Sequence, residues 1–104
     1  MRVFWTVDAE IDLIETFNHL KLKNNESFAD KVIDKIFNKS FLLENFPEMG
    51  AIQENHSAEG LKVRYLVEGK HKILYQIDAS KGVIEILAVF DTRQDPSKML
   101  SKED

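Results

Sequence analysis

The chain has 104 residues, of which 43% are hydrophobic and 31% are charged, a composition typical of one soluble globular domain. It contains no cysteine, which excludes disulfides and thiolate metal sites, and it has no apolar run near the roughly 20 residues of a membrane span. The length and these absences lead us to expect a cytoplasmic protein with one domain at 1–96 and a polar tail at 97–104. A net charge of −4 argues against a general nucleic-acid binder.

The N-terminal region predicts a short strand and then a helix. Apolar residues alternate over Val3–Val7, which favours a strand. Apolar side chains then recur at i, i+4 spacing over Asp8–Leu22, which indicates an amphipathic helix capped by Thr6 or Asp8. The carboxylates of this helix, including Asp12, are predicted to form its solvated face. The predicted apolar stripe consists of Ala9, Leu13, Phe17 and Leu20.

A second helix is predicted from Ser27 to the Phe46-Pro47 pair. Ser27 offers an N-cap oxygen, and Asp30 follows three residues later, as in a weak capping box. Phe46 precedes a proline, which pushes its backbone out of the helical region and ends the helix. About four residues join the two helices, so they should pack as an antiparallel hairpin. Residues 47–60 are predicted to be an exposed loop.

Three further strands are predicted over Leu61–Val67, Lys72–Asp78 and Val83–Phe90. The connections between them contain Gly69 and Gly82, where a tight turn needs a positive φ angle. The resulting element order is β-α-α-β-β-β. We therefore predict an α+β fold in which a helical hairpin packs on one face of a small antiparallel sheet.

The two turns predict a strand register, and the register predicts two faces. Pairing Leu66 with Lys72 and Asp78 with Val83 places one set of apolar side chains under the helices. This core face is expected to contain Val63, Tyr65, Ile73, Tyr75, Ile77, Ile84, Ile86, Ala88 and Phe90. The opposite face carries an apolar band of Leu66, Leu74, Leu87 and Val89. Four cations are predicted to rim that band, namely Lys62, Arg64, Lys72 and Arg93.

No predicted element covers the band, and an uncovered apolar band of this kind usually marks a binding surface. Two alternatives are that the tail folds back over it, or that a homodimer buries it. Single cations also have structural alternatives, since Arg64 can pair with Glu85 across the strands and Arg93 can form a turn network with Asp91 and Asp95. The three histidines lack metal-ligand spacing and no cofactor motif is present, so we expect neither a metal nor a cofactor.

Four segments carry a resemblance to a known family. The first is TVDAEIDLIETFNHL, with a threonine cap before an A-x-x-D-L core, and the second is the loop FPEMG. The third is LKVRYLVEGKHKILYQID, with an arginine strand, a glycine turn and an I-x-Y strand, and the last is VIEILAVFDTRQDP, whose ending is similar to H-x-R-x-D-P. Together they resemble the ParE/RelE toxins of type II toxin–antitoxin systems, which include plasmid stabilisation proteins, and they lie nearer the ParE branch. The resemblance implies the same architecture and a small antitoxin as partner.

The resemblance leaves the target open between two branches. RelE-like members cut mRNA on the ribosome with a Lys/Arg cluster on the open sheet face. The candidate catalytic residues for that reaction here are Lys62, Arg64, Lys72 and Arg93. However, no Tyr or His follows Arg93, where a late general acid or base would lie. ParE-like members poison DNA gyrase and lack the nuclease cluster, so we favour a non-enzymatic toxin directed at gyrase over a ribosome-dependent endoribonuclease.

The antitoxin is expected to bind the apolar band. Its predicted contacts are Leu66, Leu74, Leu87, Val89, Arg64 and Lys72. The chain would then occur in a toxin–antitoxin hetero-oligomer, with a homodimer as the alternative. A third class remains open, in which the chain is a non-toxic interaction module that has kept the fold after losing its target.

Overall fold

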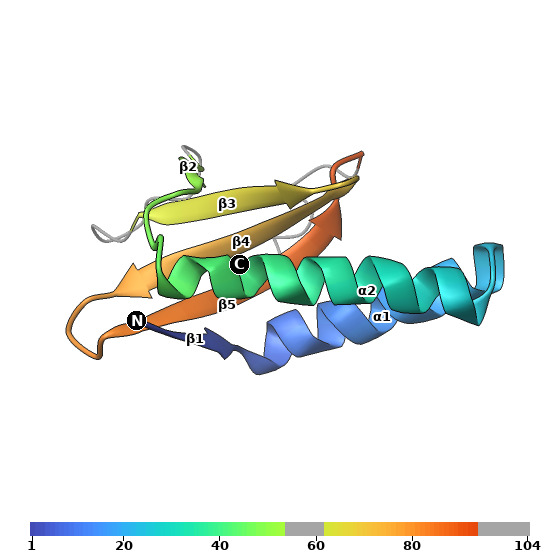
Figure 1. Ribbon diagram of the computed structural model, residues 1–104, viewed down its shortest axis with the longest axis horizontal. Coiled ribbons are helices and arrows are strands. Elements are labelled where there is room, and N and C mark those ends of the chain that lie inside the picture. The colour runs from blue at the N-terminus through green and yellow to red at the C-terminus, as the bar shows by residue number, and fades with distance from the viewer. Residues whose placement is uncertain (54–61, 94–104) are drawn as a thin grey trace, which may run out of the picture.

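The computed structural model describes residues 1–53 and 62–93, and it has the predicted α+β class, with a helical hairpin packed against a five-stranded sheet (Figure 1). The strands are β1 (Arg2–Trp5), β2 (Ala51–Ile52), β3 (Val63–Glu68), β4 (His71–Asp78) and β5 (Val83–Asp91). The helices are α1 (Val7–Lys23), α2 (Glu26–Phe41) and the short 3-10 helix η1 (Leu42–Glu44). None of the described helices is long and apolar enough to cross a membrane.

The sheet has the order β1-β5-β4-β3-β2, and it is mixed rather than wholly antiparallel. β3, β4 and β5 form two antiparallel hairpins, and β2 pairs antiparallel with β3 at the edge. β1 runs parallel to β5, which is possible because most of the chain separates these two strands and no hairpin turn joins them. β2 lies within residues 47–60, so the prediction of a loop there is corrected at β2, which is exposed but paired.

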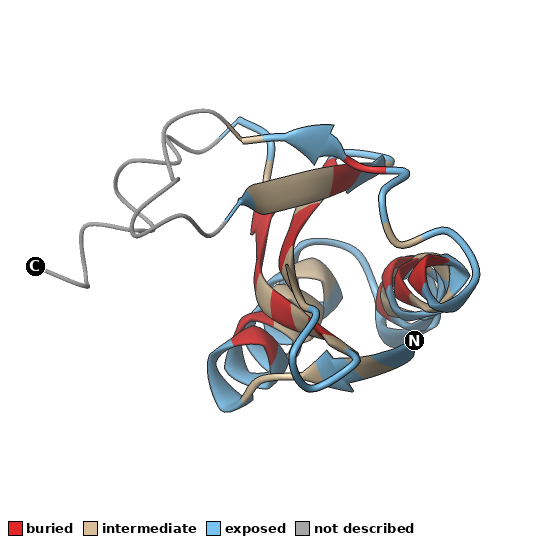
Figure 2. Cartoon of the chain, turned by 90° about the vertical axis from the view of Figure 1, so that its left-hand side faces the viewer, coloured by how far each residue is buried: buried red, intermediate tan, exposed pale blue. Residues whose placement is uncertain are grey.

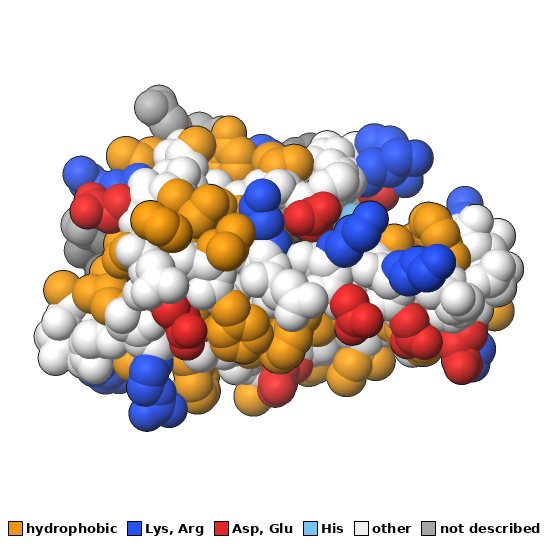
Figure 3. Space-filling view, in the orientation of Figure 1, with side chains coloured by type: hydrophobic (Ala, Val, Ile, Leu, Met, Phe, Trp, Pro, Cys, Tyr) orange, Lys and Arg blue, Asp and Glu red, His pale blue; other side chains and the backbone are white. Residues whose placement is uncertain are grey.

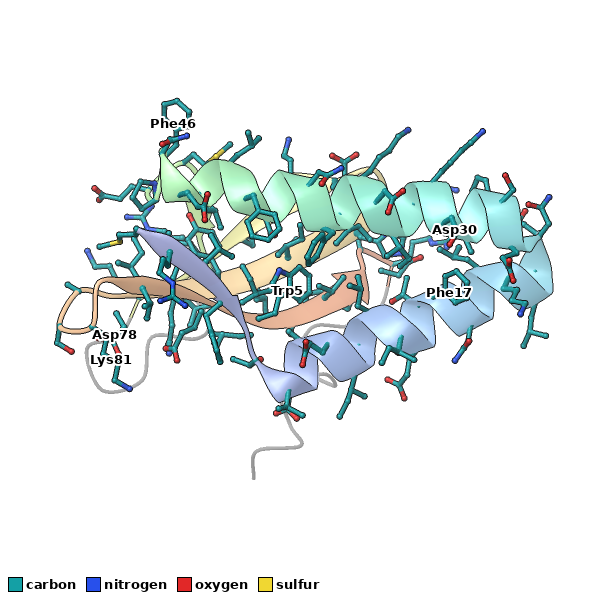
Figure 4. The ribbon with its side chains drawn as sticks, turned by 60° about the horizontal axis from the view of Figure 1, so that its bottom comes forward. Trp5, Phe17, Asp30, Phe46, Asp78 and Lys81 are labelled. Atoms are coloured by element: carbon teal, nitrogen blue, oxygen red, sulfur yellow. The ribbon has the colours of Figure 1, made fainter. Side chains whose placement is uncertain are left out.

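The start of α1 is fixed by Thr6, one of the two predicted caps. Its Oγ1 accepts a hydrogen bond from the Ala9 N–H at 3.2 Å and donates one to the Ile86 carbonyl at 2.7 Å. The neighbouring Trp5 lies between the helices and the strands (Figure 4), and its Nε1 donates to the Ser40 Oγ of α2 at 3.1 Å. One short stretch of chain therefore joins β1, both helices and β5.

The boundaries of α2 differ from the prediction at both ends. Asn25 is the N-cap, since its Oδ1 accepts a hydrogen bond from the Phe28 N–H at 2.8 Å. The prediction of Ser27 as the cap is wrong because Asn caps a helix as well as Ser does and comes first in the chain. α2 ends at Phe41 and continues as η1, so the chain leaves the α-helical conformation before it reaches Phe46-Pro47.

β3 pairs with β4 one residue away from the predicted register. Glu68 lies opposite His71, which leaves a two-residue turn of Gly69 and Lys70, with Gly69 at a φ of 60°. Glycine at the first position of a two-residue turn suits a hairpin. Because side chains alternate along a strand, a slip of one residue exchanges the two faces of β3. The residues affected are Val63 and Tyr65, which leave the helix-facing side, and Arg64 and Leu66, which join it.

A β-bulge causes a second exchange of faces in β5. The predicted register of β4 with β5 holds from their turn as far as Tyr75, which lies opposite Ile86. Leu74 then pairs with Ala88, which leaves Leu87 as an extra residue. Beyond the bulge, the faces of β5 are the reverse of those predicted. The residues affected are Ala88 and Phe90, which turn away from the helices, and Val89, which turns toward them.

Two hydrophobic clusters lie on opposite faces of the sheet, and Figure 2 shows the buried parts of both helices turned toward the strands. The cluster under the helices contains Ala9, Ile36, Leu43, Leu66, Ile73, Tyr75, Ile84, Ile86 and Val89. The cluster on the other face contains Leu74, Ala88 and Phe90, with Val63, Tyr65 and Leu87 packed against it. The predicted core face is thus confirmed for Ile73, Tyr75, Ile77, Ile84 and Ile86 and is wrong for the other four residues.

Asp12 ties α1 to β5 directly after the bulge. Its Oδ2 accepts a hydrogen bond from the Val89 N–H at 3.0 Å, and the side chain is buried. The prediction that Asp12 belongs to a solvated face is therefore wrong. The carboxylate is retained in the interior because a strand N–H next to a bulge is directed at it, and a buried polar group needs such a partner.

Candidate functional site

The four predicted cations do not share one surface. Arg64 lies opposite Tyr75 on the helix-facing side of the sheet, whereas Lys72 lies on the other side. Lys62 is exposed immediately before β3, and Arg93 is exposed just beyond β5. These side chains therefore do not form the cluster that could hold a phosphate and stabilise the charge of an attacking ribose hydroxyl.

Arg64 holds the loop that precedes β2. Its Nη1 donates to the Gly50 carbonyl at 2.9 Å and to the Glu48 carbonyl at 3.3 Å, and its Nη2 lies 3.6 Å from Glu48 Oε2. The predicted alternative of an ion pair with Glu85 is wrong, because Glu85 lies on the opposite face and accepts from Gln76 Nε2 at 2.9 Å. The contacts of Arg64 are those of a structural residue.

Tyr75 fixes the same loop from the sheet. Its hydroxyl donates to the Pro47 carbonyl at 2.8 Å and accepts from the Gly50 N–H at 3.0 Å. Burial raises the pKa of the Tyr75 hydroxyl, which therefore stays protonated and able to donate. A side chain at Gly50 is excluded, because a Cβ atom there would lie 2.6 Å from the Tyr65 carbonyl oxygen and 2.7 Å from the Tyr75 hydroxyl. The prediction that Tyr75 packs in the core is confirmed.

Arg93 forms the turn network that the sequence offered as the alternative to a target contact. Its Nε donates to Asp91 Oδ1 at 2.9 Å, and its Nη2 donates to Asp91 Oδ2 at 2.6 Å. The hydrogen bonds from Arg93 hold the pKa of the Asp91 carboxyl well below its usual range. Asp95, the other carboxylate of the predicted network, lies outside the described residues. The charge of Arg93 is thus balanced within its own turn.

We call the sheet surface opposite the helices the outer sheet face. The second hydrophobic cluster lies on this face. Its buried residues are Leu74, Ala88 and Phe90, and the partly buried Val63, Tyr65 and Leu87 pack against them. Lys72 lies on this face with its Nζ 4.1 Å from the centroid of the Tyr65 ring, a cation–π contact. Val67 lies on the same face of β3 as Tyr65 and is 47% exposed. The outer sheet face thus has an aromatic and aliphatic surface with the Lys72 ammonium over one of its rings, and the carboxylate of Glu85 lies on the same face.

Half of the predicted antitoxin contacts lie on the outer sheet face. Leu74, Leu87 and Lys72 are there, whereas Leu66 and Val89 are buried under the helices and Arg64 holds the loop before β2. The placement of these last three was wrong because the register slip and the bulge moved them to the other side. Leu74 is only 1% exposed, so it supports the surface from beneath. The predicted alternative in which the tail covers this face falls outside the described residues.

A cleft of about 900 Å³ opens between the α1–α2 hairpin and the β3–β4 turn. Figure 3 shows it as a notch bordered by several Lys and Arg side chains. Its lining includes Asp12, His19, Lys35, Lys70, His71 and Arg93. Sequence reasoning missed this cleft, because its walls come from distant segments that only the tertiary fold brings together.

His71 lies in the cleft wall, and the pKa of its side chain is shifted. Burial lowers the pKa of its imidazole, the Asp91 carboxylate acts in the opposite direction, and the charges of Arg93 and Lys70 lower it further. His71 is therefore neutral at neutral pH. Within residues 1–53 and 62–93, no three His, Asp or Glu side chains are grouped to hold a metal ion.

A comparison with known protein families gives one match that covers most of the chain. The model of the ParE toxin of the parDE type II toxin–antitoxin system matches residues 3–96. The chain belongs to the ParE toxin family. The match spans all four segments in which the sequence resembles the family.

A solved structure has the same fold as this ParE-family chain. It is described as the chromosomal ParDE toxin–antitoxin system from P. aeruginosa, and it aligns with a TM-score of 0.70 over 88% of this chain and 95% of that chain. The two sequences are 20% identical, so this likeness shows a shared fold alone. Among curated proteins, none matches this chain significantly in sequence.

The lowered pKa of His71 predicts a dependence of stability on pH. The unfolded chain binds a proton near the ordinary histidine pKa of 6.5, whereas the folded chain resists protonation until lower pH. The free energy of unfolding should therefore fall as pH drops through 6.5 toward the folded-state pKa. We expect a His71→Asn variant to lose less stability than the wild type between neutral pH and about pH 5 in urea unfolding. Parallel pH profiles for the two proteins would contradict this account.

Proposed function

We propose that this ParE-family chain is the toxin of a type II toxin–antitoxin module, that it acts in the cytoplasm, and that it arrests growth by poisoning DNA gyrase. The separation of its cations supports gyrase over the ribosome. A nuclease that acts on mRNA needs several cations directed at one phosphate, but Arg64 is bonded to the loop before β2 and Arg93 to Asp91. The net charge of −4 also works against docking on ribosomal RNA.

The outer sheet face is the antitoxin site in this proposal. Val67 is exposed on it, Tyr65 and Leu87 are half-buried, and Lys72 adds positive charge. An amphipathic antitoxin segment with acidic side chains suits this surface, because its apolar side can cover the aliphatic groups while a carboxylate meets Lys72. Leu74 contributes by holding the surface in shape.

The gyrase proposal predicts a specific inhibition in vitro. Micromolar purified chain, added to DNA gyrase and relaxed plasmid, should inhibit supercoiling or trap cleaved plasmid. Prior mixing with the antitoxin encoded beside it should abolish the effect. Growth arrest in cells without any effect on gyrase would contradict the proposal. In that case, codon-dependent mRNA cleavage on translating ribosomes would assign the chain to ribosome-directed toxins, and unchanged growth would mark a non-toxic module.

The antitoxin site makes a separate prediction. The substitutions Val67→Glu and Lys72→Glu each place negative charge on the outer sheet face, and each should weaken antitoxin binding by about tenfold or more, since about 1.4 kcal/mol corresponds to tenfold. A matched control for Lys72→Glu is Lys31→Glu, which makes the same charge change at an exposed position of α2, and this change is larger than that of Val67→Glu. Isothermal titration with the antitoxin measures all three. Unchanged affinity of the first two variants, or an equal loss in the control, would exclude this site.

A further inference from the structure

α1 has a second apolar stripe, on the side that does not contact the sheet. Its inner side packs on the core through Ala9 and Leu13. Its outer side exposes Val7 by 69%, Ile11 by 48% and Ile14 by 60%. The spacing of i, i+4 and i+7 places these three side chains in one row along the helix. Single exposed aliphatic residues are ordinary on a protein surface, but a row of them is typical of a helix face that binds a partner.

The charged side chains beside this outer stripe in the first turns of α1 are acidic. Asp8, Glu10 and Glu15 are exposed beside it, and the sequence has no Lys or Arg between Arg2 and Lys21. Lys21 itself is paired with Glu26, with Nζ 3.4 Å from Oε1. Figure 3 shows hydrophobic and acidic side chains together along the lower rim, where α1 runs. The stripe is therefore a row of apolar side chains with negatively charged side chains beside it.

The negative border restricts what can cover the stripe. Nucleic acid and anionic lipid carry phosphates that Asp8, Glu10 and Glu15 repel. A second copy of this chain would bring the same carboxylates against these three, and like charges across an interface are unfavourable. A protein surface with an apolar centre and a Lys/Arg rim is complementary in both respects.

We infer that the outer stripe of α1, formed by Val7, Ile11 and Ile14, is the surface through which the chain binds its target protein, and that the target presents an apolar patch rimmed by Lys and Arg. This inference rests on the proposed function for its choice of target. An enzyme that handles DNA carries basic surfaces along the DNA path, and an acidic, apolar helix face is suited to such a surface. The stripe is distinct from the outer sheet face, because α1 packs on the sheet side opposite to Lys72.

The test uses Ile11→Glu, which adds a charge in the middle of the stripe, and Asn38→Glu, which adds the same charge at an exposed position of α2. Three properties are measured, namely growth arrest on induced expression, inhibition of gyrase supercoiling, and affinity for the antitoxin. Ile11→Glu should abolish growth arrest and raise the half-inhibitory concentration against gyrase by about tenfold or more. Its antitoxin affinity should stay within about twofold of the wild type, which shows that it folds. Asn38→Glu should match the wild type in all three properties.

The possible outcomes distinguish the proposal that gyrase is the target from the inference that the outer stripe of α1 binds the target. If Ile11→Glu arrests growth as the wild type does, the target surface is misplaced while the gyrase proposal stands. If the wild type arrests growth without affecting gyrase, the gyrase proposal fails, and growth arrest by the variant still decides the role of the stripe. A wild-type chain inert in both assays overturns both claims. A wild-type dimer that Ile11→Glu dissociates in sedimentation would make the stripe a self-interface and would also overturn the inference.

Discussion

The two surfaces of the sheet depend on the β-bulge at Leu87 and on the carboxylate that lies beside it. The bulge reverses the alternation of β5, so that Val89 faces α1 while Phe90 faces the other way. Asp12 Oδ2 then accepts a buried hydrogen bond from the Val89 N–H, which joins helix and strand. Regular pairing of β5 with β4, in which Leu87 would lie opposite Leu74, would instead place Val89 on the outer sheet face and separate its N–H from Asp12. The packing of α1 and the composition of the outer sheet face are therefore linked.

The type and order of the long elements could be predicted because periodicity and glycine turns are local properties of the sequence. The β3 register could not be predicted in this way. The observed pairing of Glu68 with His71 and the predicted pairing of Leu66 with Lys72 both form a turn that contains Gly69, and the two turns differ only in length. The bulge had no local signal, because β5 is apolar at almost every position on both faces. Site residues on β4 were therefore placed correctly, whereas Arg64 and Val89, on the strands whose faces changed, were not.

The corrected positions of the cations change the chemistry that the outer sheet face can support. A face with four cations would have suited phosphate chemistry, but the observed outer sheet face has Lys72 over an aromatic ring and buried apolar groups beneath. That composition favours binding a peptide over catalysis. The acidic, apolar outer stripe of α1 has the opposite charge character and lies on another side of the molecule. In the account proposed above, two such surfaces let this ParE-family chain bind its antitoxin and its target through different faces.

The absence of cysteine from the sequence permits the most direct measurement of this division. Single substitutions Ile14→Cys and Val67→Cys introduce one thiol into each surface, and mass spectrometry follows the rate of thiol labelling in the free chain, with antitoxin and with gyrase. The account predicts that antitoxin slows labelling of the Val67→Cys variant alone and that gyrase slows labelling of the Ile14→Cys variant alone. Protection of both positions by the same partner, or of neither by any partner, would contradict it.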